Sequence, residues 1–138
     1  MIDVRDLTIG DWVRHSFYEE NMQIHLIEDN GRIGALSSSL SASCHIDNFE
    51  PIPITREILE KNGFVLVEGC SSKWKLECNR TVVYVTAPGR EPSVDVYIPY
   101  GVGCGFGFVR IMCDLRIYAV HQLQHILRLV NFGKEIIL

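Results

Sequence analysis

Apolar and polar positions alternate most clearly in the middle of the chain, where residues 73–78 read KWKLEC. Every second side chain there is apolar or a thiol, and the side chains between them are charged. A two-residue period is typical of a strand with one buried and one solvated face. Later segments show similar alternation or are enriched in β-branched and aromatic residues. The strands expected in this half of the chain are residues 73–78, 81–86, 94–98 and 106–113.

Two helices are expected beside these strands. Thr55 can cap a short one by accepting from a first-turn amide, and Gly63 provides its stop. In residues 118–131 the apolar positions follow a helical period and fall on one broad face, which can pack on a sheet. That face consists of Ala119, Val120, Leu123, Ile126, Leu127 and Val130.

The N-terminal third predicts three more strands, at residues 8–15, 23–28 and 32–36. Asn30-Gly31 lies between the last two. This pair favours a two-residue hairpin turn, because asparagine and glycine tolerate the positive φ that such a turn requires.

Residues 41–53 show no clear periodicity and include Pro51 and Pro53, so they are expected to form an extended linker. The pattern as a whole predicts an α+β protein. An antiparallel β-meander would be packed by the short helix and the C-terminal amphipathic helix, with a small N-terminal β-barrel-like or hairpin lobe. The expected division is a β lobe over 1–40, a linker over 41–53 and an α+β lobe over 54–138, although one continuous domain fits the same pattern.

Composition narrows the class of protein. Apolar residues make up 47% and charged residues 22% of the 138 positions, which is typical of an ordered globular chain. The net charge of −4 lacks the basic excess of a phosphate-binding surface, so nucleic acid is disfavoured as a partner. No apolar run approaches the length of about 18 residues that a membrane span needs, and we expect a cytoplasmic protein.

The side chains that could take part in catalysis or bind a metal form no established catalytic or metal-binding pattern. The five cysteines include no C-x-x-C pair, so reduced thiols are the expected state, although spacing alone does not exclude zinc. His121 and His125 have the i, i+4 spacing of helical metal ligands, but Gln122 occupies the place of the general base of a metalloprotease. We therefore expect no catalytic residue, no metal site and no cofactor.

Residues 101–107 have glycine at every second position, which raises the question of a phosphate-binding loop. The spacing does not match G-x-G-x-x-G, and a strand rather than a helix is expected to follow. A loop, or a strand with a closely packed glycine face, is the simpler interpretation.

Three segments carry a resemblance: IGDWV at residues 9–13, EPIPIT at 50–55 and VHQLQ at 120–124. Together they resemble a group of small uncharacterised proteins from Bacteroides-type gut bacteria and their phages or mobile elements, which show the pattern I-G-N-x-V, E-P-I-P-L-T and V-H-Q-L-Q. Asp11 replaces the usual asparagine of that pattern. The resemblance implies a shared fold and a mobile-element context, and it implies no reaction, because the group has no assigned activity.

The leading hypothesis is a non-enzymatic interaction protein of a phage or mobile element. Its partner would bind an exposed helix face formed by His121, Gln124, His125 and Arg128. One alternative is a small-molecule binder or enzyme with a pocket near residues 101–107. Another is self-association through an open sheet edge.

Overall fold

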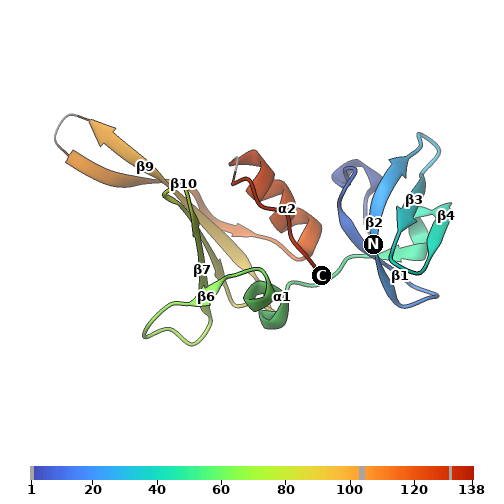
Figure 1. Cartoon of the computed structure of the whole chain (residues 1–138), viewed down its shortest axis with the longest axis horizontal. Helices are drawn as coiled ribbons and strands as arrows, with labels where there is room; N and C mark the ends of the chain where they lie inside the picture. Colours follow the sequence, from blue (N-terminus) through green and yellow to red (C-terminus); the bar gives the residue numbers. More distant parts are fainter. Residues whose placement is uncertain (1, 103–104, 131) are drawn as a thin grey trace. The chain divides into compact units, whose positions relative to one another are not determined.

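The computed structural model describes residues 2–102, 105–130 and 132–138. The chain divides between two units (Figure 1). Unit 1 consists of Met1–Pro53 and Ala119–Gln124, and unit 2 consists of Ile54–Tyr118 and His125–Leu138. Each unit is described by itself.

Unit 1 is built on a five-stranded antiparallel sheet in the order β4-β3-β2-β1-β5. The strands are β1 (Trp12–His15), β2 (Glu20–Ile27), β3 (Arg32–Leu36), β4 (Ser41–His45) and β5 (Phe49–Glu50). Two 3-10 turns, η1 (Val4–Asp6) and η2 (Ile46–Asn48), complete the unit. The predicted N-terminal β lobe is therefore present.

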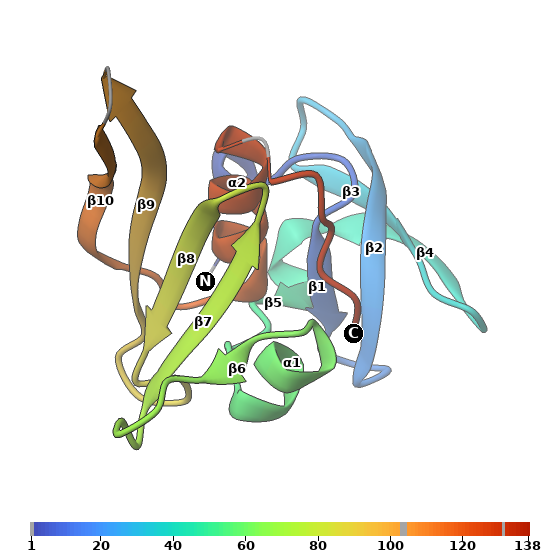
Figure 2. The ribbon, with the colours of Figure 1, turned by 60° about the vertical axis from the view of Figure 1, so that its left-hand side comes forward.

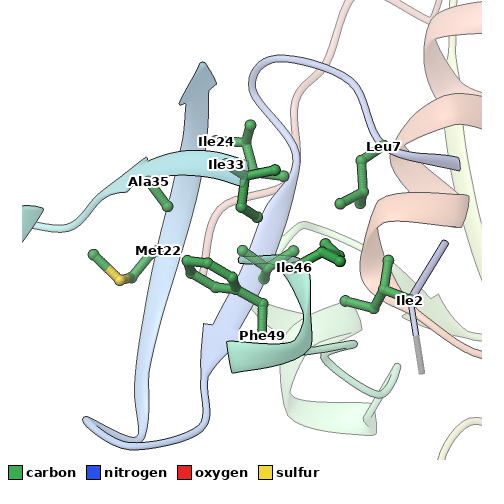
Figure 3. Close-up of a cluster of buried hydrophobic side chains, with 9 residues drawn as sticks. Ile2, Leu7, Met22, Ile24, Ile33, Ala35, Ile46 and Phe49 are labelled. Carbon is green, nitrogen blue, oxygen red and sulfur yellow. The ribbon is translucent and has the colours of Figure 1, made fainter. Parts of the chain in front are cut away.

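The core of unit 1 collects apolar side chains from most of its strands (Figure 3). Met22 and Ile24 of β2, Ile33 of β3 and Phe49 of β5 belong to this cluster, and all are almost completely buried. Truncating a side chain of this size in such a core costs about 2–5 kcal/mol. These contacts give the small sheet the hydrophobic support that a short meander lacks by itself.

The segment expected to be a linker contains regular structure. β4 pairs with β3 along its whole length, from Arg32↔His45 to Leu36↔Ser41. Ala42 and Cys44 pack against the core of the unit, while the alternate residues Ser41, Ser43 and His45 are exposed. The alternation was present in the sequence, but it is carried by residues too small and too weakly apolar to stand out.

The turn between β2 and β3 also differs from the prediction. The backbone amide of Glu28 donates to the carbonyl of Arg32, which closes a three-residue loop over 29–31. Only Gly31 has positive φ, +80°, as in a type I turn followed by a left-handed residue. Asn30 instead accepts a hydrogen bond from the amide of Arg32 at 3.0 Å, which favours this longer loop.

Unit 2 contains the second antiparallel sheet, in the order β10-β9-β8-β7-β6 (Figure 2). Its strands are β6 (Val65–Leu66), β7 (Lys73–Cys78), β8 (Thr81–Thr86), β9 (Ser93–Val102) and β10 (Gly105–Arg116). The predicted meander is confirmed. One face of β7, β8 and β9 is buried, and it carries Trp74, Leu76, Val83, Val85, Val94 and Val96.

The two predicted helices are confirmed as α1 (Arg56–Lys61) and α2 (Val120–Leu129). Thr55 caps α1 by accepting a hydrogen bond from the amide of Ile58, and Gly63 adopts a φ of +84° just after its end. Leu123 and Leu127 of α2 are buried, as its apolar face requires. Within the part of the chain that the structure describes, neither helix has the length and apolar character needed to cross a bilayer.

Candidate functional site

The predicted partner face on α2 is not an exposed surface. His121 and Gln124 are buried, with exposed fractions of 4% and 1%, and His125 and Arg128 are only partly exposed. The helical-wheel argument allowed one buried face, whereas Gln124 on the opposite side of the helix is buried with hydrogen bonds to the backbone of Gly10 and Trp12. The prediction of a solvated face was therefore wrong.

Gln124 has a structural role in unit 1. Its side-chain oxygen accepts from the backbone amide of Trp12 at 3.3 Å, and its side-chain amide donates to the carbonyl of Gly10 at 3.4 Å. The buried carboxylate of Asp11, between these two residues, accepts from the amide of Thr8 at 2.7 Å. Both polar side chains hold backbone in place, so neither is placed to act on a substrate.

The three segments that carry the sequence resemblance meet in unit 1. Gln124 joins the third segment to the first, and the amide of Val120 donates to the carbonyl of Ile52 in the second at 2.9 Å. An isolated β-bridge between Pro53 and Ala119 lies beside that hydrogen bond. These hydrogen bonds therefore help to hold the three segments together in this unit.

A cysteine–histidine pair occurs in unit 1, between residues that the sequence did not connect. Cys44 Sγ lies 3.5 Å from Nε2 of the buried His15. Nδ1 of His15 accepts from the amides of Phe17 and Tyr18, at 3.2 and 3.4 Å, so the proton of the neutral ring lies on Nε2 and faces the sulfur.

This arrangement does not activate the thiol. A nucleophilic cysteine needs a partner that removes its proton, whereas here the ring already carries a proton on the nitrogen that faces the sulfur. Burial raises the pKa of the Cys44 thiol, and the charge of Arg32 only partly offsets this effect. The pair is therefore a packed structural contact.

Unit 1 has two open depressions of about 520 and 530 Å³. Asp3, Asp29 and Asp47 line the first, together with His45, whose Nδ1 lies 3.0 Å from Oδ2 of Asp47. The second is lined mainly by loop and strand-end residues around Gly10 and Ser37. Across the described residues, no three His, Cys, Asp or Glu side chains are grouped closely enough to hold a metal ion.

The glycine-rich segment belongs to the hairpin of β9 and β10. Gly101 and Gly107 are paired with Phe106 and Tyr100 in this hairpin. No helix follows the glycines, so the geometry of a phosphate-binding loop is absent from the described residues of this segment. Gly103 and Cys104 lie outside the described residues, as do the side chains of most of their neighbours.

The face of β7, β8 and β9 opposite the buried one presents a cluster of tyrosines and cations. Strand register brings it together, because Lys75 is paired with Tyr84, Tyr84 with Asp95, and Tyr97 with both Val82 and Arg110. Side chains at paired positions extend from the same face of a sheet. We call this surface the tyrosine face and define it as Lys73, Lys75, Glu77, Val82, Tyr84, Asp95, Tyr97 and Arg110.

Cations and rings are in contact across the tyrosine face. The rings of Tyr84 and Tyr97 meet edge to face, with centroids 5.7 Å apart and an interplanar angle of 88°. Lys73 Nζ lies 4.5 Å from the centroid of Tyr84, and the guanidinium carbon of Arg110 lies 5.9 Å from that of Tyr97. Both distances are within the range of cation–π attraction.

Two of the three cations are neutralised by carboxylates on the same face. Lys75 is ion-paired with Glu77 at 3.1 Å, and the Glu77 hydrogen bond raises the pKa of Lys75. Arg110 is ion-paired with Asp95, which also accepts from the amide of Asp114 at 2.8 Å. Burial opposes the ionisation of Asp95, but these hydrogen bonds outweigh it and lower the pKa of Asp95.

A depression of about 350 Å³ opens in the tyrosine face, and we call it the notch. It is lined by Lys73, Lys75, Glu77, Val82, Tyr84 and Tyr97. Val82 lies between Glu77 and Tyr97 in one cross-strand row, and its side chain is much shorter than those of its neighbours. The notch therefore has an apolar floor, aromatic walls and a charged rim.

The sequence contained part of this signal. Alternation assigned Lys73, Lys75 and Glu77 to a solvated face, whereas the pocket considered from the sequence was placed near residues 101–107. What alternation does not supply is the register of strands, which decides that Tyr84 and Tyr97 are neighbours across β8 and β9.

No family model, curated protein or solved structure matches this chain. Its function must therefore be argued from the side chains described above.

Proposed function

We propose that this protein is a non-enzymatic interaction protein that binds a protein partner on its tyrosine face. The observation that carries the proposal is the contact of Tyr84 and Tyr97 with each other and with Lys73 and Arg110 on an open sheet face. Tyrosine and arginine are enriched at the centres of protein interfaces, because each combines a large contact area with polar groups that fix orientation.

The polar groups in the rest of the chain support a binding role over a catalytic one. The described cysteine with a histidine neighbour, Cys44, has a raised pKa and faces a ring proton. The buried polar side chains of Asp11 and Gln124 are engaged with backbone. These groups stabilise the fold, and none of the three is placed as a nucleophile beside a base that could activate it.

The setting that we propose is the cytoplasm of a bacterium, with the protein acting as an accessory factor of a phage or mobile element. Its resemblance to proteins of such elements supports the second point. The free thiols of Cys44, Cys70 and Cys78, of which Cys70 is exposed, suit a reducing compartment.

The test is a tagged pull-down from the lysate of the bacterium that encodes the chain, quantified by mass spectrometry. It compares the wild type with Tyr97→Ala and with Phe17→Ala. Phe17 is an aromatic residue of unit 1 with an exposed fraction of 82%, so its truncation removes a ring of similar size that is not part of the tyrosine face. Circular dichroism confirms that each variant is folded.

We expect a protein that the wild type and Phe17→Ala recover equally and that Tyr97→Ala recovers about tenfold less, as for an aromatic residue at the centre of an interface. Equal recovery by all three chains, or loss with Phe17→Ala alone, would contradict the assignment to the tyrosine face.

A further inference from the structure

The notch combines an apolar floor with one cation that forms no close ion pair with a described carboxylate. Lys73 Nζ faces the ring of Tyr84 and lies outside ion-pairing distance of the described carboxylates, while its charge acts over a longer distance on Asp95 and helps to lower the pKa of that residue. Lys75, by contrast, is paired with Glu77 at 3.1 Å. Two lysines and one glutamate line the notch, so its rim has a formal excess of one positive charge.

The position of Lys73 indicates the sign of the charge that a ligand of the notch should carry. Two perpendicular tyrosine rings beside a glutamate are also the elements of a cage for a cation. Here the ammonium of Lys73 already lies 4.5 Å from the Tyr84 centroid and lines the notch itself. A cationic ligand would have to displace this group, whereas an anionic ligand would pair with it.

The ion pairs on the same face indicate how many negative charges a ligand of the notch should carry. Nucleic acid binding depends on several cations that follow a phosphate backbone. On the tyrosine face Arg110 is neutralised by Asp95 and Lys75 by Glu77. What remains is the capacity to pair one negative charge.

The size and shape of the notch indicate an anchoring side chain rather than a free small molecule. Its volume of about 350 Å³ is near the lower end of small-molecule sites. All its lining residues come from β7, β8 and β9 on one face of the sheet, so a bound group is covered on one side only. A free ligand usually buries most of its surface, and a group carried by a larger partner obtains further contacts outside the notch.

We propose that the notch binds an aromatic side chain of a protein partner next to a single carboxylate, as in a Trp-Asp or Tyr-Glu pair of an acidic segment. The ring would lie on Val82 against the tyrosines, and the carboxylate would accept from the ammonium of Lys73. This inference rests on the proposed function, because it specifies the chemistry by which a partner is recognised on the tyrosine face.

The experiment is a titration of the labelled full chain with short peptides, followed by amide chemical shifts in NMR spectra at low salt. The probes are acetyl-Gly-Trp-Asp-Gly-amide, the same peptide with asparagine in place of aspartate, and the same peptide with lysine in that place. The proteins are the wild type, Lys73→Gln and the matched control Lys61→Gln, whose side chain is exposed on α1 of the same unit.

We expect the aspartate peptide to bind the wild type with a dissociation constant on the order of 1 mM and to shift amides of β7, β8 and β9. The asparagine and lysine peptides should bind about tenfold more weakly, because they lack the charge-assisted hydrogen bond. Lys73→Gln should abolish the preference for aspartate over asparagine, and Lys61→Gln should retain it.

Filling the notch provides a second test that does not depend on charge. Val82→Phe, checked for its fold by circular dichroism, should weaken the aspartate and asparagine peptides equally. If it does not fold, Tyr97→Ala removes a wall of the notch and should have the same effect.

Three results would overturn the inference. One is equal affinity for the aspartate and lysine peptides, or an aspartate preference that survives in Lys73→Gln. Another is micromolar binding of free indole-3-acetate, which would assign the notch to a small molecule. The third is tighter binding of an oligothymidylate than of the aspartate peptide, lost in Lys73→Gln, which would indicate a nucleic-acid surface.

Failure of this inference is distinguishable from failure of the proposed function. If no peptide preference is found but Tyr97→Ala still loses the partner in the pull-down, only the chemistry of the anchor is wrong. If partner recovery does not depend on Tyr97, the tyrosine face itself is the wrong surface.

Discussion

The side-chain amide of Gln124 donates to the backbone carbonyl of Gly10, 114 positions earlier in the chain, at 3.4 Å. The same side chain accepts from the amide of Trp12, so one glutamine satisfies backbone groups on both sides of Asp11. Gln23 also donates to the carbonyl of Gly10, at 2.9 Å. The segment from Gly10 to Trp12, which leads into β1, is thereby held by side chains from the neighbouring strand β2 and from helix α2, which is distant in the sequence.

Gln124→Ala should destabilise unit 1 by about 1–3 kcal/mol, because it removes the buried side-chain amide that bonds to the partly buried backbone of Trp12 and Gly10. Urea denaturation followed by circular dichroism measures the change. Asn21→Ala, an amide truncation at an exposed position of β2, serves as the control and should stay within about 0.5 kcal/mol of the wild type. A similar small effect of Gln124→Ala would contradict the structural role given to this residue.

Asn62→Ala should release the C-terminal tail. The buried amide of Asn62 donates to the carbonyl of Ile137 at 2.8 Å, and its oxygen accepts from the amide of the same residue at 2.8 Å. Without these bonds the amide of Ile137 should exchange its hydrogen at least about tenfold faster, which corresponds to about 1.4 kcal/mol of lost protection. Unchanged exchange at Ile137 would show that other contacts hold the tail.

The stability of unit 2 should depend on the ionisation of Asp95. Its pKa is lowered in the folded protein, so the ionised form stabilises the fold above the unfolded value of 3.8. This contribution should decrease as pH falls through the lower pKa of the folded state. Asp95→Asn should therefore be less stable than the wild type at neutral pH, and the difference should shrink as the pH falls below 3.8 in urea titrations. A difference that stays constant with pH would contradict the role of the charge.

Cys44 should resist alkylation at neutral pH, since burial raises the pKa of its thiol and iodoacetamide reacts with the thiolate. Cys70 is exposed and provides the internal comparison. Peptide mass spectrometry after brief treatment should find Cys70 modified and Cys44 largely unmodified, with the two becoming equivalent in denaturant. Rapid modification of Cys44 in the folded chain would show that His15 activates it after all.

Local chemistry was sufficient to predict several elements. The alternation of residues 73–78 predicted β7 because the contrast between charged and apolar side chains is large at every step. Thr55 and Gly63 marked α1 because capping depends on residues within one turn of the helix end. Asn79 and Arg80, with φ of 49° and 67°, form a two-residue turn between β7 and β8, in the gap between the strands expected at residues 73–78 and 81–86.

Two local predictions were inexact. One missed a strand because the polarity of its successive side chains differs little, and the other concerned the type of a turn. β4 has the period of a strand, but serine, alanine and cysteine differ too little in polarity for the pattern to be recognised without β3 beside it. The hairpin at Asn30-Gly31 was correctly placed. Its loop over 29–31 is not the primed two-residue turn that the Asn-Gly pair favours, because Asn30 accepts a hydrogen bond from Arg32 and only Gly31 takes positive φ.

By itself, the sequence determined which faces of strands and helices are apolar and where the chain turns, because those properties depend on neighbouring residues. Only the tertiary structure decided which polar residues are buried and which form a surface cluster. Gln124 is on the polar side of its helix, yet it is buried, with hydrogen bonds to the backbone of Gly10 and Trp12. Tyr84 and Tyr97 lie on consecutive strands, and strand register places them in one cluster with Lys73. Both outcomes depend on how separate segments pair and in which register, and no local pattern contains that information.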